Sequence, residues 1–116
     1  MSELSLPHKE PILFAKNVLS KDTMSARVAV EFPQTPSLSM MIEASAQSTA
    51  AFNDGSKKGG YLVGMKNIKL LKAANEKKLE VEVVLKHSVE NMRLINFEVY
   101  EQSLLLCKGS LTIALS

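Results

Sequence analysis

The sequence of 116 residues predicts one α+β domain, residues 1–116, in which an antiparallel sheet packs against one long helix. Three observations predict this class. Several short segments alternate β-branched and polar residues, one run of small and apolar residues has the length of a helix, and the links between the later strands are short.

Two strands are predicted before the helix. Residues 12–19 are rich in β-branched and aromatic side chains, and the turn sequence "SKDT" separates them from residues 25–32. In the second run Ala26, Val28 and Val30 alternate with more polar positions, as in a half-buried strand. Because Pro33 and Pro36 cannot donate a backbone hydrogen bond, we expect strand pairing to stop there.

The predicted helix spans residues 37–52, "SLSMMIEASAQSTAAF". Ser37 stands at the N-cap position, and "NDGSKKGG" supplies turn residues after the end. The second half then predicts strands over 61–71, 79–87, 92–100 and 104–115. Because the links between them are short, we expect these consecutive strands to be antiparallel neighbours.

Composition excludes several classes of protein. No apolar run is long enough to cross a membrane, and the N-terminus lacks the pattern of a signal peptide, so we expect a cytoplasmic protein. The single cysteine, Cys107, excludes an internal disulfide and a zinc cluster, and we expect it to be a small buried apolar residue. Neither a metal nor another cofactor is expected.

The net charge is +2, but the lysines are concentrated between Ser56 and Lys78. Such a basic strip suits an acidic partner or a phosphate, and it equally suits lysines that only solubilise strand surfaces. The scarcity of arginine and of interleaved aromatic residues argues against nucleic acid.

Glu43 is the anomaly of the predicted helix. The helix has no charged face, so we expect it to be enclosed nearly all round. A carboxylate removed from water is costly unless it is hydrogen-bonded, paired or protonated. An enclosed Glu43 is therefore the strongest candidate for a functional group.

Four segments in order, "LPHKEPILFAKNVL", "FPQTP", "MMIEASAQSTAAF" and "GYLVGMKNIKLLK", resemble the hot-dog-fold 3-hydroxyacyl-acyl-carrier-protein dehydratases. The likeness covers residues 6–115 and includes the variant subgroup of aryl polyene pigment pathways. It implies a sheet wrapped around one central helix, a homodimer with a continuous sheet, and active sites at the dimer interface. In that family the segment "IEASAQ" carries the catalytic carboxylate, here Glu43.

One departure from the family concerns the catalytic base. Dehydration needs a base for the proton alpha to the thioester carbonyl and an acid for the leaving hydroxyl. Glu43 suits the acid, but "FPQTP" has Gln34 or Thr35 where the family has a histidine. His8 is the candidate base if the N-terminal segment, or that of a dimer partner, covers the site; otherwise it anchors the N-terminal turn. His87 is expected on an exposed hairpin.

Other candidate residues are assigned to the substrate or to its carrier. Thr35, Ser39, Gln47 and Tyr61 are candidates for substrate binding. Three of them could instead have a structural role: Ser39 could cap the helix, Tyr61 could pack in the strand, and Gln47 could orient Glu43. For docking of an acyl carrier protein, or binding of a coenzyme A thioester, the candidates are Lys66, Lys69 and Lys72.

Three functions remain open at this point. The first is a dehydratase acting on 3-hydroxyacyl carrier-protein thioesters in fatty acid or polyene-type biosynthesis, with Glu43 as acid and His8 or a bound water as base. The second is an acyl thioesterase of the same fold, in which Glu43 activates water. The third is a non-catalytic subunit that binds the acyl group or its carrier.

Overall fold

The structure, a computed structural model, describes residues 13–52 and 60–115. It consists of one α-helix, a short 3-10 turn and six strands, with the bounds β1 (Ala15–Lys21), β2 (Ser25–Glu31), α1 (Leu38–Ser48), η1 (Thr49–Phe52), β3 (Gly60–Leu70), β4 (Lys78–Val89), β5 (Met92–Glu101) and β6 (Leu104–Leu115). The predicted element order is confirmed. The predicted first strand began at residue 12, which lies outside the described residues.

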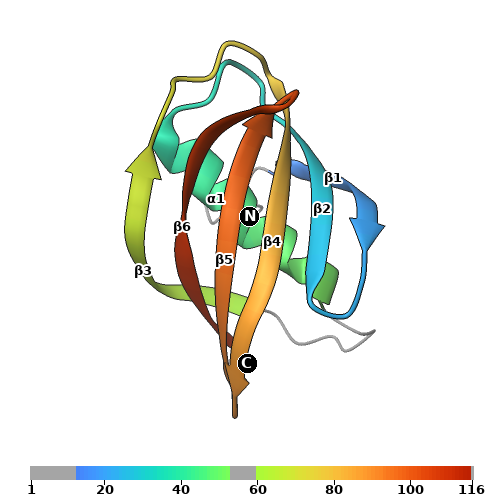
Figure 1. Cartoon of the computed structure of the whole chain (residues 1–116), viewed down its shortest axis with the longest axis vertical. Helices are drawn as coiled ribbons and strands as arrows, with labels where there is room; N and C mark the ends of the chain where they lie inside the picture. Colours follow the sequence, from blue (N-terminus) through green and yellow to red (C-terminus); the bar gives the residue numbers. More distant parts are fainter. Residues whose placement is uncertain (1–12, 53–59, 116) are drawn as a thin grey trace, which may run out of the picture.

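All six strands form one antiparallel sheet in the order β1-β2-β4-β5-β6-β3. In Figure 1 the helix α1 runs obliquely behind this sheet, with β3 at one edge and β1 at the other. The helix contacts β1, β4, β5 and β6, so one face of the sheet and one side of the helix enclose the core.

The expectation that consecutive strands pair is wrong for β3 and β4. Strand β3 pairs with β6, whereas β4 lies between β2 and β5. The short link between β3 and β4 crosses the ends of β5 and β6, and hydrogen bonds hold it there. The backbone N–H of Leu71 donates to the carbonyl of Leu106 at 2.7 Å, and the N–H of Asn75 donates to the carboxylate of Glu101 at 2.7 Å.

The two faces of the sheet follow the period-2 pattern of its strands. Side chains that face the helix are buried, among them Val81, Val83, Ile95, Phe97 and Val99. The alternate positions face outward and include several charged residues. There Arg27 pairs with Glu80 at 3.1 Å and with Glu82 at 3.2 Å.

The helix buries a single stripe, made of Met41, Ala44, Ser45 and Ser48. These residues are spaced by three and four positions and therefore share one face. The buried hydroxyl of Ser45 donates to the carbonyl of Met41 at 2.8 Å, and that of Ser48 donates to the carbonyl of Ala44 at 2.7 Å. Polar atoms on the buried face are thus satisfied by the helix itself.

The opposite face of the helix carries Glu43, and its side chain is exposed. The expectation of a helix enclosed nearly all round is therefore wrong for a single chain, because the sheet lies against only one side of α1. The predicted start is confirmed: the Ser37 hydroxyl accepts a hydrogen bond from the N–H of Met40 at 3.3 Å. The α-helix ends at Ser48, and the 3-10 turn continues the predicted segment to Phe52.

Strand β3 contains two register shifts in its pairing with β6, and the second of them is a β-bulge. The register shifts between Lys66 and Lys69, and Asn67 has a left-handed φ of 58°. Opposite the bulge stands Gly109, where an added Cβ would lie 3.0 Å from the Phe97 ring and 3.2 Å from the Cα of Ile68. The absence of a side chain at Gly109 therefore lets Ile68 on β3 and Phe97 on β5 both pack closely against β6.

No helix in the described part of the chain is long and apolar enough to span a membrane. The cytoplasmic location stays a prediction.

Candidate functional site

Glu43 lies at the border of a hollow between the helix and one edge of the sheet. The hollow has a volume of about 300 Å³, and its lining residues come from α1, β3 and β6: Glu43, Ala46, Gln47, Tyr61, Leu62 and Ile113. Most of this lining is apolar, and the carboxylate is its charged group. A hollow of this kind suits an apolar chain with one reactive polar end.

The side-chain amide of Gln47 is held in one orientation. Its Oε1 accepts hydrogen bonds from the backbone N–H groups of Phe14 at 2.7 Å and Ala15 at 3.2 Å. Because a backbone N–H can only donate, the oxygen must face β1 and the amide nitrogen must face the other way. That nitrogen donates to Oε2 of Glu43 at 3.3 Å.

The bond from Gln47 reaches one carboxylate oxygen of Glu43 and comes from a group that the backbone already orients. The side chain of Glu43 remains exposed, so its other oxygen is available to a water molecule or a substrate group. A carboxylate held in this way can accept a proton from water, or donate one when it is protonated. The helix geometry explains the contact, since residues four apart are neighbours on a helix surface.

The other predicted substrate-binding residues are dispersed. Tyr61 lines the hollow with Glu43 and is 61% exposed. Ser39 is exposed in the first helical turn, and Thr35 is exposed in the bend before it. Neither Ser39 nor Thr35 lines the Glu43 hollow, so their role in binding stays a prediction.

The two histidines differ in what the structure says of them. His8, the candidate base, lies outside the described residues. His87 is exposed and pairs in register with Leu94, which alternates with the inward-facing Ile95. His87 therefore points to the outer face of the sheet, away from the helix, as expected for an exposed hairpin position. Among the described residues no imidazole lies on the side of Glu43.

Cys107 is fully buried, as predicted, and burial raises the pKa of its thiol to about 11. The thiol is therefore protonated at neutral pH and is a poor nucleophile. Among the described residues no group of three or more His, Cys, Asp or Glu side chains could hold a metal ion.

The predicted docking lysines lie on or just after β3. Lys66 pairs in register with Ser110, Lys69 pairs with Lys108, and Lys72 follows the end of the strand. All three predicted lysines are exposed.

Sequence reasoning missed three residues of the hollow, Ala46, Leu62 and Ile113. Leu62 and Ile113 are ordinary apolar strand residues, and they lie beside Glu43 only because β3 pairs with β6. The pattern of a strand says nothing about which distant strand it will join, so the sequence held no signal for them.

Comparison with solved structures supports one fold. The chain resembles smu.793 from Streptococcus mutans UA159 bound to acetyl CoA, with a TM-score of 0.73, 11% identity and coverage of 94% of each chain. It also resembles a hypothetical thioesterase protein with coenzyme A from Streptococcus pneumoniae TIGR4, with a TM-score of 0.70, 11% identity and coverage of 86% of this chain and 84% of that one.

A third similar structure is the HP0420-homologue from Helicobacter felis, with a TM-score of 0.68, 19% identity and coverage of 88% of each chain. The chain has the hot-dog fold. At these identities the likeness concerns the fold and does not separate the dehydratases from other hot-dog proteins. No family model matches the sequence, and no curated protein matches it significantly.

Proposed function

We propose that this hot-dog protein hydrolyses acyl thioesters, with Glu43 as the general base. The observation that carries the proposal is the Glu43 carboxylate, oriented by Gln47 and open to water at the border of a largely apolar hollow. Two of the similar structures contain coenzyme A or acetyl CoA, which supports a thioester as the substrate class.

The reaction needs no second titratable group to begin. Glu43 takes a proton from a water molecule, and the water oxygen attacks the thioester carbonyl carbon. The carbon–sulfur bond then breaks, and Glu43 gives its proton to the departing sulfur, so that the products are a free thiol and a carboxylic acid. Because this mechanism requires no imidazole, it agrees with a described site that contains none.

The deciding experiment follows both possible products from a matched pair of substrates. The purified protein is offered a saturated acyl thioester and the corresponding 3-hydroxyacyl thioester, each on coenzyme A and on an acyl carrier protein. We expect release of free thiol from the saturated substrate, measured with a thiol-reactive dye. Binding of the substrates without thiol release or enoyl formation would contradict the proposal and favour a non-catalytic binding subunit.

A dehydratase is the second candidate, favoured by the Gln47–Glu43 hydrogen bond within the segment "IEASAQ" that resembles that family. In that case Glu43 protonates the leaving 3-hydroxyl group, and the base comes from His8 or from a bound water. The same assay identifies this reaction, since the 3-hydroxyacyl substrate would give a trans-2-enoyl thioester without release of thiol.

We also propose that the protein is a homodimer joined through the free edge of β3. This strand is at the end of the sheet, is 11 residues long, and exposes Val63 and Met65 by 56% each. A long apolar edge strand is a template for pairing with another chain. The other edge, β1, is only 7 residues long. A second β3 would also bring new residues beside Tyr61 and Leu62, which line the Glu43 hollow.

Charged side chains on the β3 edge should separate the dimer. We expect the wild type to have twice the 12.7 kDa mass of one chain in light scattering, and the double variant Val63→Asp, Met65→Asp to have the monomer mass. The matched control is Val18→Asp, Leu19→Asp on the opposite edge, which should remain dimeric. If the β3 variant stays dimeric and the β1 variant becomes monomeric, the interface lies on β1 and the proposal is wrong.

A further inference from the structure

The bulge in β3 gathers lysines that a regular strand would separate. Lys66 and Lys69 are three residues apart, so in a regular strand they would point to opposite faces. The bulge shifts the register between them, and their partners on β6 are Ser110 and Lys108. These partners are two residues apart and alternate with the buried Leu111 and Cys107, so both face outward. Lys66, Lys69 and Lys108 therefore share the outer face and are named here the β3–β6 lysine cluster.

Among the residues that the structure describes, the three lysines form no ion pair; the ion pairs there are those of Arg27 with Glu80 and Glu82. Glu98 on β5 stands opposite Lys108 without forming an ion pair with it. Lys69 and Lys108 stand directly opposite each other on neighbouring strands, a like-charge pairing that is unfavourable and that Glu98 offsets from one side only. This charge pattern favours a negatively charged partner.

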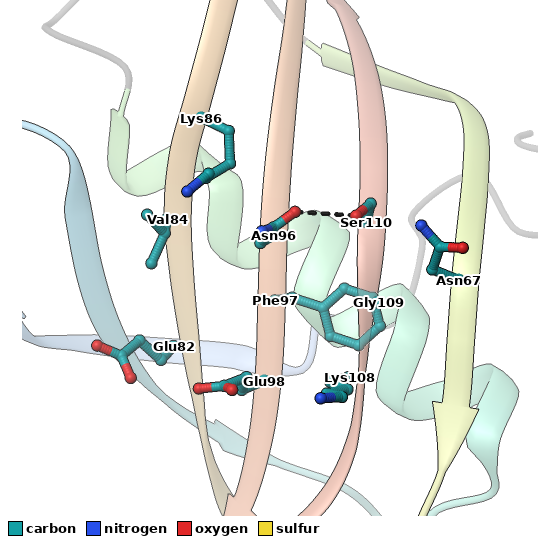
Figure 2. Close-up of a pocket in the computed structure, with 10 residues that line it drawn as sticks. All are labelled: Asn67, Glu82, Val84, Lys86, Asn96, Phe97, Glu98, Lys108, Gly109 and Ser110. Atoms are coloured by element: carbon teal, nitrogen blue, oxygen red, sulfur yellow. Dashed lines mark hydrogen bonds between the residues drawn. The ribbon is translucent and has the colours of Figure 1, made fainter.

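The rest of the outer face limits where that partner can lie. Glu82 and Glu98 stand opposite each other on β4 and β5, and Figure 2 shows them in one row with Lys108. The lysines of the cluster thus lie on β3 and β6, whereas β4 and β5 carry Glu82 and Glu98 together with Lys86. An acidic surface is attracted to the cluster and repelled by the two glutamates, which favours a position over β3 and β6.

A hollow of about 350 Å³ lies beside the cluster on this face (Figure 2). Its lining includes the bulge residue Asn67 and the hydrogen-bonded pair of Ser110 and Asn96, whose side-chain oxygens are 2.9 Å apart. Amides and hydroxyls in a shallow hollow offer hydrogen bonds to the polar groups of a protein surface. In the described part of this hollow the aromatic residue is Phe97, which points inward and is 1% exposed, so it cannot stack on a nucleobase.

We propose that the outer face of β3 and β6 is the docking surface for an acidic protein that carries the acyl group, and that Lys66, Lys69 and Lys108 bind its carboxylates. That the partner carries an acyl group rests on the function proposed above. That the partner is acidic is inferred from the charges of the lysine cluster alone. Pairing of the β3 edges would place the two lysine clusters of a dimer side by side. Lys108 was not predicted from the sequence, and the role of Lys72 stays a prediction.

The test compares carrier-bound and free substrates in one protein. The triple variant Lys66→Glu, Lys69→Glu, Lys108→Glu should lose about tenfold or more of kcat/KM with an acyl group on an acidic acyl carrier protein, because steering by charge is lost. With the same acyl group on coenzyme A, its kcat/KM should stay within about twofold of the wild type. The wild-type rate with the carrier protein should also fall as salt is added, since salt screens exposed charges.

The matched control carries the same change of charge elsewhere: Lys16→Glu, Lys21→Glu, Lys77→Glu. These lysines are also exposed, and this variant should retain the wild-type rate with both substrates. An equal loss in the control would overturn the proposal, since it would reflect net charge alone. An equal loss with free acyl coenzyme A would overturn it too, because the lysines would then bind the phosphates of coenzyme A.

Direct binding separates this proposal from the proposed activity. If the wild type turns over neither substrate, the hydrolase proposal fails, and titration calorimetry with the acidic carrier protein still tests the docking surface. Binding that is lost in the cluster variant and kept in the control supports the surface. Equal binding by the wild type and both variants would contradict the proposed docking surface. A Lys→Gln version of the cluster variant repeats each measurement if the Lys→Glu version does not fold.

Discussion

Replacement of Glu43 by glutamine is expected to lower kcat/KM for thioester hydrolysis by about 10²- to 10⁴-fold, the usual range for the loss of a general base. Glutamine keeps the size and the hydrogen-bonding reach of the side chain but cannot accept the proton from water. Because Glu43 is exposed on the face of α1 opposite its buried stripe, the change should leave the unfolding temperature nearly unchanged. The measurement is thiol release under kcat/KM conditions, together with a thermal melt.

Glu90→Gln is the matched control, since Glu90 is an exposed carboxylate at the turn between β4 and β5 and does not line the hollow. Gln47→Glu tests the neighbouring positioning residue, because it keeps an acceptor for the N–H of Phe14 but places a second carboxylate beside Glu43. We expect this variant to change the pH profile of hydrolysis more than its stability. Full activity of Glu43→Gln would remove Glu43 from the reaction.

Addition of one methyl group at Gly109 is expected to destabilise the fold by about 1–3 kcal/mol, the range for overpacking a filled core. The new Cβ would lie 3.0 Å from a ring carbon of Phe97 and 3.2 Å from the Cα of Ile68. The Phe97 ring is buried, and the Cα of Ile68 is part of the backbone at the bulge. Neither group can therefore move away without a shift of its strand. The midpoint of urea unfolding of Gly109→Ala measures the effect.

Gly64→Ala on β3 is the matched control, since its Cβ would meet the Thr112 side chain at an ordinary 3.8 Å. We expect its unfolding midpoint to be close to that of the wild type. Ile68→Val removes a methyl group that the Cβ at residue 109 would strike, so the double variant with Gly109→Ala should recover part of the lost stability. A Gly109→Ala protein as stable as Gly64→Ala would show that β3 does not lie against β6 as described.

Local patterns in the sequence were sufficient for the elements and for the choice of Glu43. Alternation in residues 25–32 and 79–87 predicted strands that the structure contains, because such alternation is stable only where one face of a sheet is buried. Ser37 predicted the helix start through the hydrogen bond it accepts. The same segment drew attention to Glu43, since one carboxylate among small and apolar residues is unusual.

The exposure of Glu43 could not be predicted in the same way. The wheel of α1 has no charged face, and this suggested a helix covered on all sides. In the described part of the chain, Met41, Ala44, Ser45 and Ser48 are the buried residues of α1, because the sheet lies on one side of the helix. Serine hydroxyls that bond back to the helix make a polar residue compatible with burial, so composition alone did not reveal which face was inside.

The sequence by itself determined the number and order of the elements, the cap at Ser37 and the lone carboxylate, because each depends on neighbours within a few residues along the chain. Only the tertiary structure decided that β3 joins β6, since that pairing depends on contacts between distant segments. The same pairing places Leu62 and Ile113 beside Glu43 and Lys108 beside Lys69. The long-range register of one edge strand therefore builds both the candidate site and the proposed docking surface.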